Sequence, residues 1–153
     1  MIIKTERLTI RLATDDEMRS LIDSETDEEM KKAYGEMLAG CLSEPEERQW
    51  YAAWFIELSN GQRIGDICFK GLSSDGCVEI GYGLLPEFFG CGYATEAVTA
   101  MVKWASNQPN VKRIEAETDP DNKASQRVLE KSGFVPTGEY GEEGPRFIWK
   151  SFI

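Results

Sequence analysis

The chain of 153 residues contains no histidine, and its four cysteines include no Cys-x-x-Cys pair. Without histidine, nucleophilic triads that depend on an imidazole base are excluded. A zinc site is not expected either, because its usual nitrogen ligands and paired sulfur ligands are missing. We therefore expect no metal, and we expect the cysteines to be free thiols in a reducing cytosol.

Positive charge and long apolar runs are also scarce. Lysine and arginine number 17 against 27 aspartate and glutamate, which gives a net charge of −10. A dedicated nucleic-acid binder would carry a basic surface, whereas an acidic protein attracts a cationic amine at long range or is simply soluble. No apolar run approaches the roughly 20 residues that span a bilayer, and charges from Lys4 onward are not typical of a signal peptide. We expect a cytoplasmic protein that binds neither nucleic acid nor membrane.

The length predicts one domain over residues 1–153. A capping box at Thr14 and Glu17 predicts a helix start, and Gly61 and Gly76 mark hairpin turns. Hydrophobic periodicity predicts strands at 2–12, 50–58, 63–71, 77–85, 111–118, 134–140 and 146–153. Further helices are expected at about 28–42, at 93–106 and from 121 or 122 to 131.

Residues 79–98 form the most informative segment, a predicted strand, a short glycine loop and a helix start. Pro86 ends the strand, and Gly90 and Gly92 precede the helix. Unpaired N–H groups at a helix start favour phosphate, and glycine lets a ligand approach closely. The dinucleotide-binding pattern is excluded because Thr95 replaces its third glycine, and no Gly-Lys-Ser/Thr follows. A flexible turn before a helix is the alternative.

Two further segments give the loop a specific meaning. The loop resembles the pyrophosphate-binding motif of the GNAT superfamily of acyl-CoA-dependent N-acetyltransferases. That family's later motif is matched by Asn122, Ser125, Val128, Leu129, Gly133 and Phe134. Residues 5–11 (TERLTIR) and 92–97 (GYATEA) resemble the RimJ/RimL-like branch, which acetylates protein N-termini among other amines. The resemblance covers essentially the whole chain.

The resemblance implies the fold and the co-substrate. The expected fold is α+β, a mostly antiparallel mixed sheet of about seven strands with about four helices, splayed between strands 4 and 5. Acetyl-CoA would lie along the fourth strand, where Gly81 and Gly83 fit a β-bulge. The expected cofactor-binding residues are Gly83, Leu84, Leu85, Phe89, Gly90, Cys91, Gly92, Tyr93, Ala94, Thr95, Asn122 and Ser125. A backbone N–H near Leu84 would stabilise the developing oxyanion. Asn122 would contact the cofactor, cap its helix, or do both.

The chain departs from the family pattern at two positions. Phe89 stands where the loop usually has Gln or Arg, although the branch often has an aromatic residue there. Leu129 stands where many members carry a tyrosine that protonates the leaving thiolate. Ser125 is then the best remaining acid, with solvent as the alternative. Tyr82 and Tyr140 are further options, although such residues are more often core aromatics.

A carboxylate is the natural base because histidine is missing. Glu117 matches a position where some N-terminal acetyltransferases carry a base, and Glu79 begins the fourth strand. Either side chain could instead lie on a solvated face. Glu96 in the first helical turn favours the helix dipole and is expected to be a structural anchor.

Three functions compete at this point. The leading one is an acetyl-CoA-dependent N-acetyltransferase acting on a primary amine, such as a protein N-terminus, a small amine or an aminoglycoside-like compound. A non-catalytic acyl-CoA-binding module or sensor would keep the fold and lose the chemistry, as the missing tyrosine permits. A nucleotide-binding regulator would bind ATP or NAD in place of CoA. The protein is expected to be a monomer or a homodimer.

Overall fold

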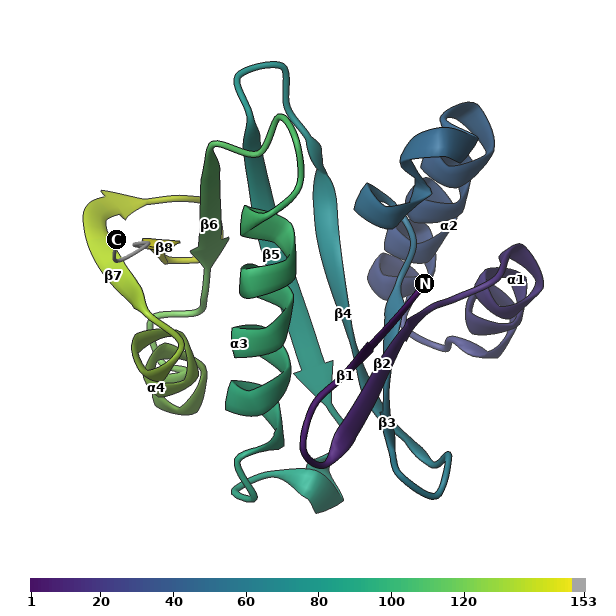
Figure 1. Ribbon diagram of the computed structural model, residues 1–153, viewed down its shortest axis with the longest axis horizontal. Helices are drawn as coiled ribbons and strands as arrows, with labels where there is room; N and C mark the ends of the chain where they lie inside the picture. The colour runs from purple at the N-terminus through teal and green to yellow at the C-terminus, as the bar shows by residue number, and fades with distance from the viewer. Residues whose placement is uncertain (150–153) are drawn as a thin grey trace.

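The computed structural model describes residues 1–149, and its core is one mixed sheet of eight strands in the order β1-β2-β3-β4-β5-β6-β8-β7 (Figure 1). The strands are β1 (Ile2–Lys4), β2 (Leu8–Leu12), β3 (Trp54–Leu58), β4 (Arg63–Leu72), β5 (Cys77–Leu84), β6 (Arg113–Glu117), β7 (Phe134–Tyr140) and β8 (Pro145–Trp149). The helices are α1 (Asp15–Ser24), α2 (Glu28–Ser43), α3 (Tyr93–Ser106) and α4 (Lys123–Lys131), with 3-10 turns η1 (Pro45–Trp50) and η2 (Pro86–Phe88).

The expected α+β fold is confirmed, with eight strands where about seven were expected. The extra strand arises because residues 2–12 are not continuous. The Thr5 N–H donates to the Leu8 carbonyl at 2.9 Å, and this turn folds β1 back against β2. A second boundary also differs, since residues 50–53 precede β3 and Trp50 ends η1, where its ring packs 5.1 Å from that of Phe69.

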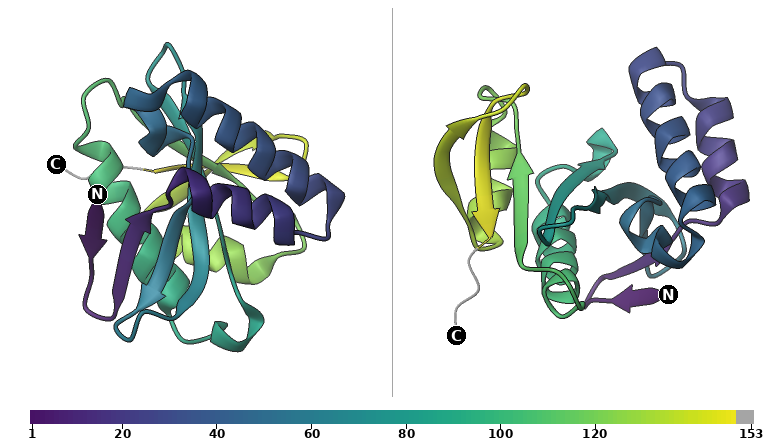
Figure 2. Two further views of the ribbon diagram at one scale, coloured as in Figure 1. Left: turned by 90° about the vertical axis from the view of Figure 1, so that its right-hand side faces the viewer. Right: turned by 90° about the horizontal axis from the view of Figure 1, so that it is seen from above.

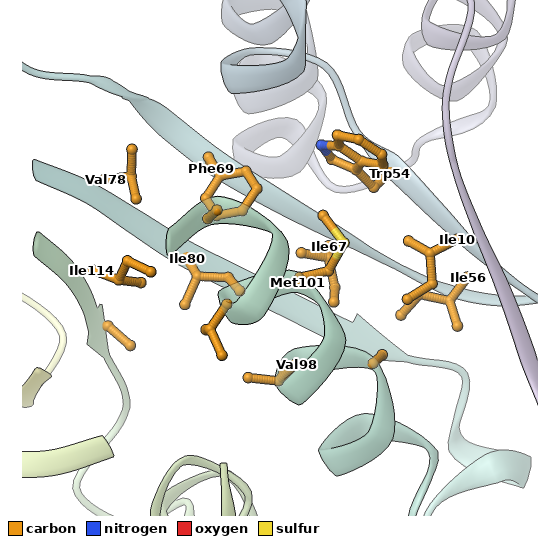
Figure 3. Packing of buried hydrophobic residues seen from close by; sticks show 14 of the residues in the cluster. Ile10, Trp54, Ile56, Ile67, Phe69, Val78, Ile80, Val98, Met101 and Ile114 are labelled. Carbon is orange, nitrogen blue, oxygen red and sulfur yellow. The ribbon is translucent and has the colours of Figure 1, made fainter. Parts of the chain in front are cut away.

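The main core lies between the sheet and α3. Figure 3 shows Val98 and Met101 of α3 among inward-facing residues of five strands. Each fully buried side chain of this kind stabilises the fold by about 1.5–3 kcal/mol. The labelled strand residues are Ile10, Trp54, Ile56, Ile67, Phe69, Val78, Ile80 and Ile114.

The opposite face of the sheet is covered at one end by α1 and α2. Figure 2 shows these two helices packed side by side, away from α3. Met18, Leu38 and Phe55 form a second buried cluster there. The predicted capping box is confirmed, because the Thr14 side chain accepts from the Glu17 N–H and Glu17 accepts in return. Met30, in the first turn of α2, is 43% exposed.

A split in the sheet separates β5 from β6, the expected splay between the fourth and fifth predicted strands. These two strands pair in parallel only from Cys77 with Arg113 to Ile80 with Ala116. The prediction of a β-bulge at Gly81 and Gly83 is wrong, because β5 pairs regularly with β4 at both positions. The register shift instead lies between Phe69 and Leu72 of β4. Residues 81–84 therefore present a strand edge that β6 does not cover.

β7 and β8 correspond to the last two predicted strands and pair with each other in antiparallel fashion, and β8 also pairs with β6. The last part of the predicted strand 146–153 lies outside the described residues. Within residues 1–149, none of the helices combines the length and apolar character that crossing a membrane requires.

Candidate active site

A cleft of about 340 Å³ opens where the end of β5 meets the N-terminal ends of α3 and α4. It brings together two motifs that are far apart in the sequence. Most of the predicted cofactor residues line it, namely Gly83, Leu84, Phe89, Gly90, Gly92, Ala94, Thr95, Asn122 and Ser125. Tyr82, Ala124 and Val128 also line the cleft and were not among the predicted cofactor residues.

Three predicted cofactor residues do not line the cleft. The Leu85 N–H donates to the Ile64 carbonyl at 2.8 Å, so this group already serves the sheet. Cys91 is exposed at the tip of the loop. The Tyr93 ring packs at 6.3 Å from Phe88. Leu85, Cys91 and Tyr93 therefore belong to the loop region without lining the cleft, whereas the residues next to them do line it.

The glycine loop has the geometry of an anion cradle. Gly90 and Gly92 have φ of 76° and 82°, a region that residues with a Cβ rarely adopt. The first intrahelical bond of α3 runs from the Glu96 N–H to the Gly92 carbonyl at 3.1 Å. The N–H groups of residues 93–95 therefore have no partner within the helix. Together with the helix dipole, they form a site that suits a phosphate group.

The N-terminal turn anchors this loop. Glu96 accepts from the Thr5 hydroxyl, from the Arg7 N–H at 2.9 Å and from Arg7 Nε at 2.7 Å. Arg7 Nη1 also donates to the Cys91 carbonyl at 3.0 Å, and its guanidinium lies 4.4 Å from the Tyr93 ring centre. Glu96 is thus an anchor, as expected, and Arg7 brings a positive charge to the loop. Both residues stand in the quoted motifs, but the contact between them is not deducible from either.

At the start of α4, three side chains converge on the other wall of the cleft. Asn122 caps the helix through Oδ1, which accepts from the Ser125 N–H at 3.0 Å. The Ser125 hydroxyl lies 2.9 Å from the Tyr82 hydroxyl. Burial raises the pKa of Tyr82, although its hydrogen bond with Ser125 opposes the shift. Tyr82 is therefore a protonated donor at neutral pH. The expected tyrosine position, Leu129, is buried in the core.

The two glutamates predicted as bases lie beyond the cleft in an ion-pair network. Arg146 of β8 contacts Glu117 at 2.5 Å and Glu79 at 2.8 Å. The second oxygen of Glu117 accepts from the Glu143 N–H at 2.7 Å, and Lys70 pairs with Glu79 at 2.8 Å. Burial favours a higher pKa for Glu79, but the bonds from Lys70 and Arg146 outweigh burial and lower it. The structure does not bring either carboxylate into the lining of the cleft.

Comparison with known proteins gives a direct match to one family. The model of the acetyltransferase (GNAT) domain matches residues 4–135. The uncharacterized N-acetyltransferase YoaA of Bacillus subtilis is 30% identical over 149 residues, which span 90% of this chain and 84% of that protein.

Two solved structures share the fold at low sequence identity. The ribosomal-protein-S5-alanine acetyltransferase of Vibrio fischeri has a TM-score of 0.74 at 18% identity, covering 99% of this chain and 100% of that one. A variant of the spermidine N-acetyltransferase SpeG of Vibrio cholerae also has a TM-score of 0.74, at 16% identity and 94% coverage of each chain.

Proposed function

The chain belongs to the GNAT family of N-acetyltransferases, and from that premise we propose that it transfers the acetyl group of acetyl-CoA to a primary amine. The observation that carries the proposal is the cleft, which joins a glycine loop at one helix start to Asn122 and Ser125 at another. In an acyl-CoA, the pyrophosphate would bind at the glycine loop and the thioester would lie near Asn122 and Ser125.

Binding is supported by the backbone. The cradle at Gly90 and Gly92 would hold the pyrophosphate, and Arg7 adds a positive charge beside it. The uncovered edge at residues 81–84 offers backbone groups to the amides of pantetheine, as strand addition does elsewhere. A backbone N–H near Leu84 remains the proposed oxyanion donor.

The thioester supplies an activated acyl carbon and a thiolate leaving group. We propose that Ser125 and Tyr82 return a proton to that sulfur. This role is supported by their hydroxyls, which form one hydrogen-bonded pair at the cleft wall. We assign Ser125 as the donor and Tyr82 as the group that orients it and replenishes its proton. Glu117 and Glu79 remain proposals as bases, and the pairing of Glu79 with two cations weakens it for that role.

The acceptor is proposed only as a class. The two solved structures named above have equal TM-scores, yet one is a ribosomal-protein-S5-alanine acetyltransferase and the other a variant of a spermidine N-acetyltransferase. The fold therefore does not choose between a protein N-terminus and a small amine. The RimJ/RimL-like branch, the cytoplasmic location and a monomer or homodimer that binds no nucleic acid stay proposals, and the net charge of −10 favours a cationic acceptor.

A thermal-shift experiment with acetyl-CoA, CoA, NAD and ATP side by side tests the cofactor. A ligand at 100 times its dissociation constant stabilises the folded state by about 2.7 kcal/mol. We expect stabilisation by the two CoA species alone, followed by thiol release when amines are added. Stabilisation by NAD or ATP alone would contradict the proposal, and CoA binding without turnover of any amine would favour the non-catalytic module.

A further inference from the structure

A carboxylate that the site described so far does not use lies on the opposite face of the sheet, behind the cleft. Asp66 of β4 pairs with Gly83 of β5 and with Phe55 of β3. Directly paired residues in antiparallel strands point to the same face. Phe55 packs in the cluster beneath α1 and α2, so Asp66 faces those helices, while Gly83 also lines the cofactor cleft.

Asp66 is held on one side and open on the other. The Tyr34 hydroxyl of α2 donates to its Oδ2 at 3.1 Å. Within residues 1–149, Oδ1 has no hydrogen-bond partner, and no buried side-chain oxygen there lacks a partner. Oδ1 is therefore not fully buried, although Asp66 as a whole is half-buried. A positioned carboxylate with one free oxygen can accept a hydrogen bond from an ammonium group.

The surface beside Asp66 leaves space for a ligand. A Cβ built on Gly83 would meet nothing within 4 Å, and one on Gly81 would meet first the Cys68 sulfur at 3.5 Å. The sheet is split along this part of β5, because β6 pairs only as far as Ile80. An amine above Gly83 would face the strand edge at which the thioester is proposed to lie.

The charges around Asp66 distinguish it from the other carboxylates of this face. Burial raises the pKa of Asp66, the Tyr34 hydrogen bond and Arg63 oppose the shift, and Glu25 adds to it. Cys68 of β4 is a further titratable group that faces Asp66 and Tyr34. Whereas Arg146 neutralises Glu79 and Glu117, no cation within residues 1–149 forms a salt bridge with Asp66.

We propose that Asp66, oriented by Tyr34, binds the ammonium group of a primary alkylamine acceptor and takes its proton. This inference rests on the proposed acetyl transfer. The ammonium proton moves to the Asp66 carboxylate, and the freed nitrogen forms a bond to the acyl carbon as the carbon–sulfur bond breaks. The nitrogen then loses a second proton, and the thiolate gains one proton and leaves as the thiol. Asp66 returns its own proton to solvent.

The test compares Asp66→Asn with the wild type on three alkylamines: spermidine, n-butylamine and a peptide with a free N-terminal alanine. Hydroxylamine is the control nucleophile, because it is neutral at pH 7.5 and needs no prior deprotonation. We expect Asp66→Asn to lower kcat/KM for the alkylamine that the wild type uses by about 100-fold. Hydroxylamine turnover and the thermal shift with acetyl-CoA should stay unchanged. Asp23→Asn, on the exposed face of α1, should match the wild type throughout.

Tyr34→Phe provides a readout that a purely structural role would not move. The Tyr34 bond lowers the pKa of Asp66, so its loss should shift the acidic limb of the alkylamine pH–rate profile to higher pH. Folding should survive Asp66→Asn, because the substitution removes a half-buried charge. An unchanged or higher Tm at pH 7.5 is expected.

Each contrary outcome is informative. Wild-type alkylamine rates in Asp66→Asn would overturn the inference and leave the acetyltransferase proposal intact. Equal losses with alkylamines and hydroxylamine would also overturn it, as would a wild type that binds acetyl-CoA and acetylates none of the three amines. Failure of acetyl-CoA to stabilise the wild type would instead overturn the proposed function itself.

Discussion

The two faces of β5 are built in opposite ways. On the α3 and α4 face, the cleft is formed by glycine backbone, helix starts and neutral side chains, and Arg7 is the charge beside it. On the other face lie Asp66, Glu79 and Glu117, together with the cations that pair with the two glutamates. The first face suits a large anionic ligand that is the same for every family member. The second suits a cationic group whose recognition depends on individual side chains.

A split sheet can serve two substrates at once. Gly83 belongs to both faces, because its backbone lines the cleft while the space above it is open on the side of Asp66. A residue with a side chain there would close that space. The backbone of Gly83 therefore borders both the proposed thioester position and the proposed amine position.

The largest expected effect comes from Gly92→Glu, on the α3 and α4 face of the sheet where the cofactor is proposed to bind (the cofactor face). Two like charges about 4 Å apart at an effective dielectric of about 20 repel by about 4 kcal/mol, which corresponds to about 1,000-fold in affinity. We expect such a loss in acetyl-CoA affinity by calorimetry, because the new carboxylate would stand at the phosphate cradle.

A matched control separates charge from backbone strain. Gly61, in the turn between β3 and β4, has φ of 88°, close to the 82° of Gly92, and a Cβ there would meet nothing within 4 Å. Gly61→Glu should therefore cost similar stability and leave acetyl-CoA affinity unchanged. Equal affinities for the two variants would contradict the assignment of the loop.

The difference between the faces also explains what the sequence could predict. The cofactor cleft comes from two short motifs in which glycine, asparagine and serine act through local backbone geometry, so local patterns suffice. The bounds of α3 and α4 and the cap at Asn122 follow from the same local rules. The proposed acceptor site joins Tyr34 to Asp66 across 32 positions, and only the docking of α2 onto the sheet brings them together.

Two features of the structure could be predicted only in part from the sequence. Tyr82 alternates with Ile80, which predicts a shared inward face, but its contact with Ser125 depends on how α4 packs. The single strand predicted over residues 2–12 was wrong because its alternation continues through a turn. That turn is fixed by Thr5 and by Glu96, which lies 91 positions later.

Tyr82→Phe is the next largest change and tests how the cofactor face completes the reaction. Removing the hydroxyl that supports Ser125 should lower kcat by about 10- to 100-fold, with acetyl-CoA affinity unchanged, as measured by thiol release and calorimetry. Tyr140→Phe is the control, because Tyr140 is 74% exposed. An unaltered kcat would contradict the role of Tyr82 and leave solvent to replenish the Ser125 proton.

Arg7→Gln should produce a smaller loss on the same face. A charge-assisted hydrogen bond contributes about 1.5 kcal/mol, so we expect acetyl-CoA affinity to fall by about 10-fold while kcat at saturation is retained. Arg19→Gln, which removes an exposed pair with Asp16, is the matched control. If Arg7→Gln lowers Tm and leaves affinity alone, Arg7 acts on the fold and not on the cofactor.

The smallest expected effect concerns Glu17 in α1, on the face of the sheet that carries Asp66. Bonds from Arg11 overcome the effect of burial and, with Thr14, lower the pKa of Glu17 to about 2. A depressed carboxyl pKa stabilises the folded state above the unfolded value of 4.5, and this contribution is lost as the pH falls towards about 2. Because Arg11 and Glu17 are both about one-third exposed, Glu17→Gln should lower the free energy of unfolding by only about 1 kcal/mol at pH 7.

Urea unfolding at pH 7 and at pH 3 checks this prediction. The difference in unfolding free energy between the variant and the wild type should be smaller at pH 3. Equal acetyl-CoA affinity in both proteins would confirm that the two faces of the sheet can be altered separately, since Glu17 lies on the acceptor side alone.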